Sequence, residues 1–174
     1  MDDGFIAKPL GKRQIDQAFP LVRAMAPELP VERWRAFAAA LCGPDDGDVG
    51  ARGIITVQND RGYIHGLFSY STVDDLRHGR VVAVENFIVL DLFDPASAAA
   101  VLIKAMETVA QTLSCAAIVT DLPECYGTSP EYRGSLLTVF RGAGHVVEAL
   151  HLRKAVGATG DAPSRTLADA HDAA

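Results

Sequence analysis

The most constraining feature of this sequence is a strand, a long helix and a second strand in direct succession. Residues 80–90 form one apolar, β-branched run, and residues 115–121 form a second, continuous one that predicts a strand buried on both faces. The segment 94–113 between them repeats apolar residues every three or four positions, with Asp94 as N-cap and Pro95 at the first helical position. Two strands joined by such a helix lie parallel with a right-handed crossover.

Antiparallel strands precede this unit. The strand-like runs 53–58 and 62–73 are linked by a short Asn-Asp-Arg-Gly segment, and a short polar segment with Gly79 leads to residues 80–90. Connections of this length predict hairpins, so the three runs form a meander.

The remaining elements follow from periodicity and from Pro and Gly breakers. A short strand at 5–10 and two amphipathic helices, 15–26 and 31–41, are predicted before the meander, and a helix near 131–142 and a strand from His145 to about Lys154 after residue 121. The order is β-α-α-β-β-β-α-β-α-β, which indicates an α/β (α+β) fold with a mixed central sheet.

Length and composition favour one domain. The chain has 174 residues, of which 49% are hydrophobic and 22% charged, so it can bury a sizeable core. We expect a single domain over residues 1–156. Residues 157–174 are small, polar and aperiodic, which predicts a disordered C-terminal tail.

Charge and cysteine usage exclude several classes of function. The formal net charge is −6 and the basic residues are scattered, which disfavours binding to nucleic acid or to an anionic membrane. No apolar run is long enough for a membrane span, and the acidic start is unlike a signal peptide, so we expect a cytoplasmic protein. The three cysteines have no CxxC spacing, and no metal is predicted.

Two local phrases carry a family resemblance. The first is Val84-Glu85-Asn86-Phe87-Ile88-Val89 at the end of the fourth strand, and the second is the segment 136–145, which ends Val-Phe-Arg-Gly-Ala-Gly-His. Together with the element order, they resemble the GNAT superfamily of acyl-CoA-dependent N-acyltransferases over roughly residues 5–155.

The resemblance implies a site for acetyl-CoA as co-substrate. In that family the fourth and fifth strands splay apart, and the pantetheine arm binds backbone groups of the fourth strand, here those of Phe87, Ile88 and Val89. The pyrophosphate binds the N-terminus of the next helix, where unpaired N–H groups and the helix dipole favour anions. The corresponding contacts here are Ser97 and the two following alanines, Ala98 and Ala99.

The helix N-terminus departs from the family pattern. The usual loop has a basic residue and two glycines, whereas this chain reads Asp94-Pro95-Ala96-Ser97-Ala98-Ala99. The pyrophosphate loop is therefore degenerate, since Asp94 repels phosphate and Pro95 lacks an N–H. This departure leaves an alternative open, namely a non-catalytic GNAT-fold binding or dimerisation module that has lost acetyl-CoA binding.

Glu85 is the candidate catalytic base. Amide formation from acetyl-CoA needs a neutral amine, and Glu85 is the only acidic residue within the apolar fourth strand, four residues before Val89 and on the same side. Burial there would raise the pKa of its carboxyl. The alternative is a strand-end charge paired with an arginine such as Arg80. The tyrosine that serves as the acid in many family members corresponds here to Phe140. Tyr126 and Tyr132 could substitute for it, but a structural role as loop or core aromatics is favoured for both.

The resemblance implies direct transfer of an acetyl group to a small-molecule or peptide amine. The acidic balance of the chain mildly favours a cationic amine. Many members of the family are dimers, so a homodimer is left open.

Overall fold

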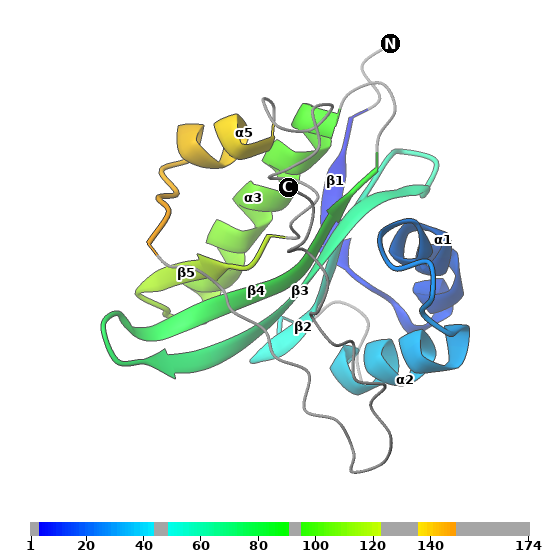
Figure 1. The fold of residues 1–174 in the computed structure, drawn as a ribbon, viewed down its shortest axis with the longest axis horizontal. Coiled ribbons are helices and arrows are strands. Elements are labelled where there is room, and N and C mark those ends of the chain that lie inside the picture. The colour runs from blue at the N-terminus through cyan, green and yellow to red at the C-terminus, as the bar shows by residue number, and fades with distance from the viewer. Residues whose placement is uncertain (1–3, 44–48, 91–94, 123–135, 149–174) are drawn as a thin grey trace, which may run out of the picture.

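The computed structural model describes residues 4–43, 49–90, 95–122 and 136–148. They form one five-stranded sheet with strand order β1-β2-β3-β4-β5, antiparallel from β1 to β4 and parallel between β4 and β5 (Figure 1). The strands are β1 (Ile6–Pro9), β2 (Arg52–Gln58), β3 (Ile64–Asp75), β4 (Gly79–Val89) and β5 (Ala117–Thr120). The expected α+β architecture, with a meander followed by a parallel pair, is thus confirmed over these residues.

Helices cover both faces of the sheet. They are α1 (Ile15–Met25), preceded by a 3-10 turn at Lys12–Gln14, α2 (Val31–Leu41), α3 (Pro95–Thr112) and α5 (Leu136–Gly142). The first pair, α1 and α2, lies on one face, and α3 with α5 lies on the other (Figure 1). Helix α3 begins at Pro95, as expected, while its predicted N-cap Asp94 lies outside the described residues. No helix in the described part of the chain is long and apolar enough to cross a membrane.

The hairpin turns use side-chain hydrogen bonds that the sequence encodes locally. Asn59 Oδ1 accepts from the backbone N–H of Arg61 and of Tyr63, and Gly62 takes φ 81° in the same turn. In the β3–β4 turn, Asp75 Oδ1 accepts from two following N–H groups, which lowers the pKa of that carboxyl. These turns fix the register of the meander.

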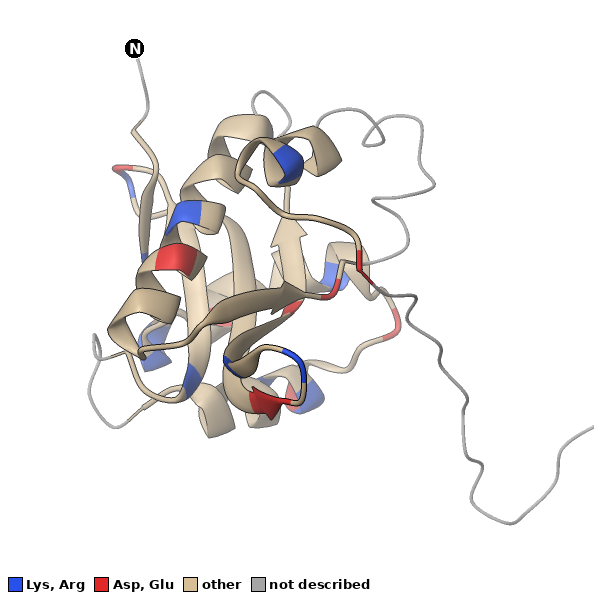
Figure 2. Cartoon of the chain, turned by 90° about the vertical axis from the view of Figure 1, so that its left-hand side faces the viewer, with Lys and Arg blue, Asp and Glu red and all other residues tan. Residues whose placement is uncertain are grey.

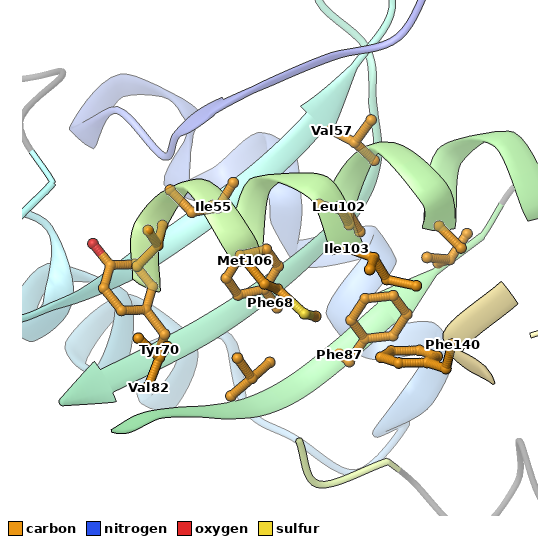
Figure 3. Packing of buried hydrophobic residues seen from close by; sticks show 14 of the residues in the cluster. Ile55, Val57, Phe68, Tyr70, Val82, Phe87, Leu102, Ile103, Met106 and Phe140 are labelled. Carbon is orange, nitrogen blue, oxygen red and sulfur yellow. The ribbon is translucent and has the colours of Figure 1, made fainter. Parts of the chain in front are cut away.

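Each face of the sheet carries its own hydrophobic core. The larger core lies under α3 and α5 and is built around Phe68, Phe87, Leu102 and Met106, all fully buried (Figure 3). The smaller core lies under α1 and α2 and includes Trp34, whose Nε1 donates to the carbonyl of Ile15 at 2.7 Å. Alternation along each strand divides the apolar side chains between these two cores.

Two strand predictions need correction. The fifth strand is not buried on both faces, because its four residues are mostly half-buried and the Val119 side chain is 42% exposed. The segment 145–148, predicted to begin the last strand, is not a strand in the structure. Three predicted segments lie outside the described residues. They are the rest of that strand, the expected tail 157–174, and residues 131–135 of the last predicted helix.

Gly66 is required where β3 passes β4. A Cβ on this residue would lie 2.7 Å from the carbonyl oxygen of Ile88 and 3.0 Å from the Cδ1 of Leu102. Because the nearest atom belongs to the backbone, Gly66→Ala must push β4 away from β3. We expect the free energy of unfolding to fall by about 1–3 kcal/mol, measured by chemical denaturation.

Gly50→Ala is the matched control for this prediction. Its Cβ would meet only the carbonyl oxygen of Arg52, at 3.6 Å, which is an ordinary contact. Equal stability losses in the two variants would contradict the proposed clash with β4.

Candidate active site

The strands β4 and β5 stop pairing before β4 ends. Their parallel ladder runs from Val81 opposite Ala117 to Val84 opposite Thr120, and the N–H of Asp121 donates to the carbonyl of Val84 at 2.9 Å. Beyond this point β4 continues to Val89 in contact with β3. Within the described residues no strand pairs with the β5-side edge of this last part of β4. The β5-side edge of residues 85–89 thus has no strand partner among the described residues, and we call this edge, beyond the carboxyl end of β5, the opening between β4 and β5.

A β-bulge lies at the start of this opening. Ser69 of β3 is opposite Glu85, but Leu67 is opposite Ile88, so one residue of β3 faces two residues of β4. Asn86 lies in this bulge with φ 53°, a left-handed conformation that Asn tolerates better than most residues. The extra residue changes which side of the sheet each later side chain of β4 faces.

The bulge corrects the expected orientation of Glu85. Val84 packs under α3, so alternation directs Glu85 to the face of α1 and α2, whereas Phe87 and Val89 return to the α3 face. Glu85 and Val89 therefore do not share a side, as the sequence alternation suggested. The Glu85 side chain is also exposed, whereas the sequence suggested burial.

Glu85 is not neutralised by a neighbouring arginine. The described ion pairs are Arg35 with Asp16, which lowers the pKa of that aspartate, and His78 with Glu148. Neither involves Glu85, so the expected alternative of a pair with Arg80 is absent from the described part of the chain. The carboxylate of Glu85 is accessible at the edge of the opening.

Of the six residues predicted to contact the cofactor, five are buried and one is exposed. Phe87, Ile88 and Val89 are buried, so only their backbone groups can reach a ligand in the opening. On α3, Ala98 and Ala99 are fully buried against the sheet and Ser97 is exposed. The first turn of a helix leaves N–H groups without intrahelical partners, which is the feature that an anion uses.

A buried hydroxyl at the opening fits a bound polar molecule. The Oγ1 of Thr120, the last residue of β5, is buried, and no described residue is within hydrogen-bond distance of it. Its neighbours at alternate positions, Ile118 and Leu122, pack on the core under α3, so Thr120 is directed to the same side. A buried polar atom without a partner is costly, and the amide groups of a pantetheine arm could supply one.

Phe140 occupies the position at which many family members are expected to carry a tyrosine that acts as the acid. Phe140 is buried, and its ring makes an edge-to-face contact with Phe87 at 5.1 Å (Figure 3). It makes a second one with His145 at 5.0 Å. Burial lowers the pKa of His145, with a smaller opposing effect from Glu107. The substitutes Tyr126 and Tyr132 lie outside the described residues.

Sequence reasoning missed one acidic neighbour of Glu85. Val84 and Thr120 are the last pair of the parallel ladder. Glu85 directly follows Val84, and Asp121 directly follows Thr120. Alternation directs both carboxylates to the face of α1 and α2. The signal in the sequence is one acidic residue within the fourth strand and one directly after the fifth, which becomes informative only once the two strands are known to be parallel neighbours.

In the part of the chain that the structure describes, charge does not mark another site. Lys, Arg, Asp and Glu are distributed over several elements rather than gathered in one patch (Figure 2). A search of the described residues finds no group of three or more His, Cys, Asp or Glu side chains that could hold a metal ion.

Comparison with solved structures shows that this chain has the fold of GNAT acetyltransferases. A complex of the aminoglycoside N-acetyltransferase AAC(6')-Iy with CoA has 20% sequence identity and a TM-score of 0.66, covering 88% of this chain and 97% of that one. Glucosamine-6-phosphate N-acetyltransferase from Arabidopsis thaliana has 11% identity and a TM-score of 0.64, covering 87% and 97%.

A structure described as a transcriptional regulator from Bacillus halodurans C-125 also matches, with 13% identity and a TM-score of 0.67, covering 88% of this chain and 100% of that one. No protein-family model and no curated protein matches the sequence.

Proposed function

We propose that this chain is an N-acetyltransferase that transfers the acetyl group of acetyl-CoA to a cationic amine. The observation that carries the proposal is the opening between β4 and β5, which lies beside the first turn of α3 in a GNAT fold. The solved relative with CoA supports a CoA-type ligand, and the buried Thr120 hydroxyl would gain a partner from it.

Glu85 is the group that we assign to proton removal. Acetyl-CoA would supply the acetyl group as a thioester, and the amine nitrogen forms the new bond to its carbonyl carbon while the sulfur leaves. A protonated amine loses two protons in this exchange. The exposed carboxylate of Glu85 accepts the first, directly or through one water molecule, and so frees the nitrogen lone pair. The second passes from the nitrogen to the departing sulfur or to solvent once the new C–N bond has formed. The side chain of Phe140 carries no proton for the leaving sulfur, so no protein acid is assigned.

The carboxylates of Glu85 and Asp121 favour a cationic acceptor. Glu85 and Asp121 directly follow Val84 and Thr120, the last pair of the β4–β5 ladder, and alternation directs both to the face opposite α3. Two carboxylates at one edge attract a positively charged amine and disfavour an acidic acceptor. An amine held there reaches the opening from the side of α1 and α2.

The alternative is a GNAT-fold module that binds a partner without catalysis. It is favoured by the first turn of α3, which begins with Pro95 and continues with small residues, and by the preceding Asp94. Neither a basic residue nor a glycine is present there to help hold a pyrophosphate. The two functions differ in whether acetyl-CoA binds.

Thermal unfolding with and without acetyl-CoA separates the two functions. Ligand at a hundred times its dissociation constant adds about 2.7 kcal/mol of stability, which raises Tm by roughly 5–10 °C for a chain of this size. CoA should give a similar shift, and acetate should give none. No shift at millimolar acetyl-CoA would reject the enzyme and favour the binding module.

A further inference from the structure

Ser69 connects β3 to the bulge of β4 through its side chain. Its Oγ donates to the backbone carbonyl of Glu85 at 3.1 Å and accepts from the Nδ2 of Asn86 at 2.9 Å. Ser69 is 3% exposed, and it is one of three buried polar residues in the described part of the chain. A buried hydroxyl with both its donor and its acceptor capacity in use indicates a specific structural task.

The two hydrogen bonds hold a backbone conformation that β4 would otherwise resist. Asn86 has φ 53°, which is unfavourable for a residue with a side chain and must be stabilised by its surroundings. The Asn86 amide is tied to Ser69, and the same Ser69 hydroxyl is tied to the preceding carbonyl. The bulge is therefore fixed from the neighbouring strand.

The bulge that Ser69 holds lies where β4 stops pairing with β5. The ladder between β4 and β5 ends at Val84, and the bulge begins at the next residue. A β-bulge bends its strand and increases the local twist. The bulge thus determines the path of the segment 87–89, whose backbone faces the opening.

We propose that Ser69 and Asn86 are positioning residues that hold the β4 bulge and thereby set the geometry of the opening in which acetyl-CoA binds. This inference rests on the proposed function for its effect on binding, whereas its effect on β4 is independent of any ligand. Neither side chain needs to touch acetyl-CoA or the acceptor. They act through the backbone of β4.

Two variants test the proposal without imposing new strain. Ser69→Ala removes both hydrogen bonds, and Asn86→Gly removes one while it retains a residue that tolerates positive φ. Each should raise the dissociation constant of acetyl-CoA about tenfold, as expected for the loss of one or two hydrogen bonds. The double variant should bind no more than about threefold more weakly than Ser69→Ala, because both changes break the same contact.

Ser71→Ala is the matched control, since Ser71 is two residues further along β3 on the same face and opposite Ala83, before the bulge. It should leave the affinity for acetyl-CoA unchanged. Loss of affinity in Ser71→Ala equal to that in Ser69→Ala would overturn the assignment, as would wild-type affinity in both Ser69→Ala and Asn86→Gly.

Hydrogen exchange separates this inference from the proposed function. Without ligand, Ser69→Ala should speed amide exchange in residues 85–90 about fivefold or more and leave residues 79–84 near wild type. If wild-type protein fails to bind acetyl-CoA, the proposed function is rejected, and this exchange pattern still decides whether the two side chains hold the bulge. Unchanged exchange in residues 85–90 would overturn the inference.

Discussion

Glu85→Gln should lower the turnover of amine acetylation about a hundredfold or more at neutral pH, because the variant cannot accept the proton that the amine loses. The side chain is exposed and makes no described ion pair, so its replacement should leave the fold and the affinity for acetyl-CoA intact. Steady-state kinetics with a panel of cationic amines, together with calorimetric titration of acetyl-CoA, provide the two readouts.

Glu107→Gln is a suitable control, since it makes the same chemical change on the exposed side of α3. It should retain wild-type turnover. If Glu85→Gln has normal turnover at both neutral and high pH, Glu85 is not the base. If it loses affinity for acetyl-CoA as well as turnover, the residue acts in binding, and proton removal must be assigned elsewhere.

Phe87→Ala should produce the largest loss of stability among these variants, about 3–5 kcal/mol in the free energy of unfolding. Phe87 is fully buried, and its ring packs edge-to-face on Phe140 at 5.1 Å. Truncation would leave a cavity between β4, α3 and α5 and would remove an aromatic pair. Urea denaturation monitored by circular dichroism measures the change.

The same truncation at Phe37 provides the comparison, because that ring lies on α2 with 39% of its surface exposed. Phe37→Ala should cost much less than Phe87→Ala. Similar losses in the two variants would mean that the core under α3 does not depend on Phe87.

Most of the architecture follows from the sequence because its signals are local. Asn59 and Gly62 mark one hairpin, Pro95 marks the start of α3, and the apolar repeat of 94–113 identifies the helix that makes β4 and β5 parallel. These features depend on residues that are near one another in the chain. Their geometry is therefore decided before tertiary contacts form.

The side of the sheet that each residue faces could not be predicted beyond Glu85. Strict alternation assumes an uninterrupted strand, and the left-handed Asn86 breaks it. The signal was an Asn within an apolar run, which by itself is equally consistent with a strand end. The separation of Glu85 from Val89 results from this one residue, whereas Glu85 itself precedes the bulge and keeps the orientation that alternation from Val84 gives it.

The candidate site also depends on contacts between distant segments. Thr120 and Asp121 become relevant only because β5 lies beside β4 and stops pairing with it after Thr120. The burial of β5 was misjudged for a related reason. A run of apolar residues predicts burial on both faces, but Val119, on the face opposite α3, belongs to neither hydrophobic core.

The conformation of Asn86 limits which substitutions this position can accept during evolution. Only Gly, Asn and Asp adopt left-handed φ readily, so most single changes there would strain the strand. Gly would keep the conformation and lose the side-chain donor to Ser69, and Asp would keep the side-chain size but present no amide. Asn is the residue that satisfies both demands, so drift at this position should be slow although the residue is exposed.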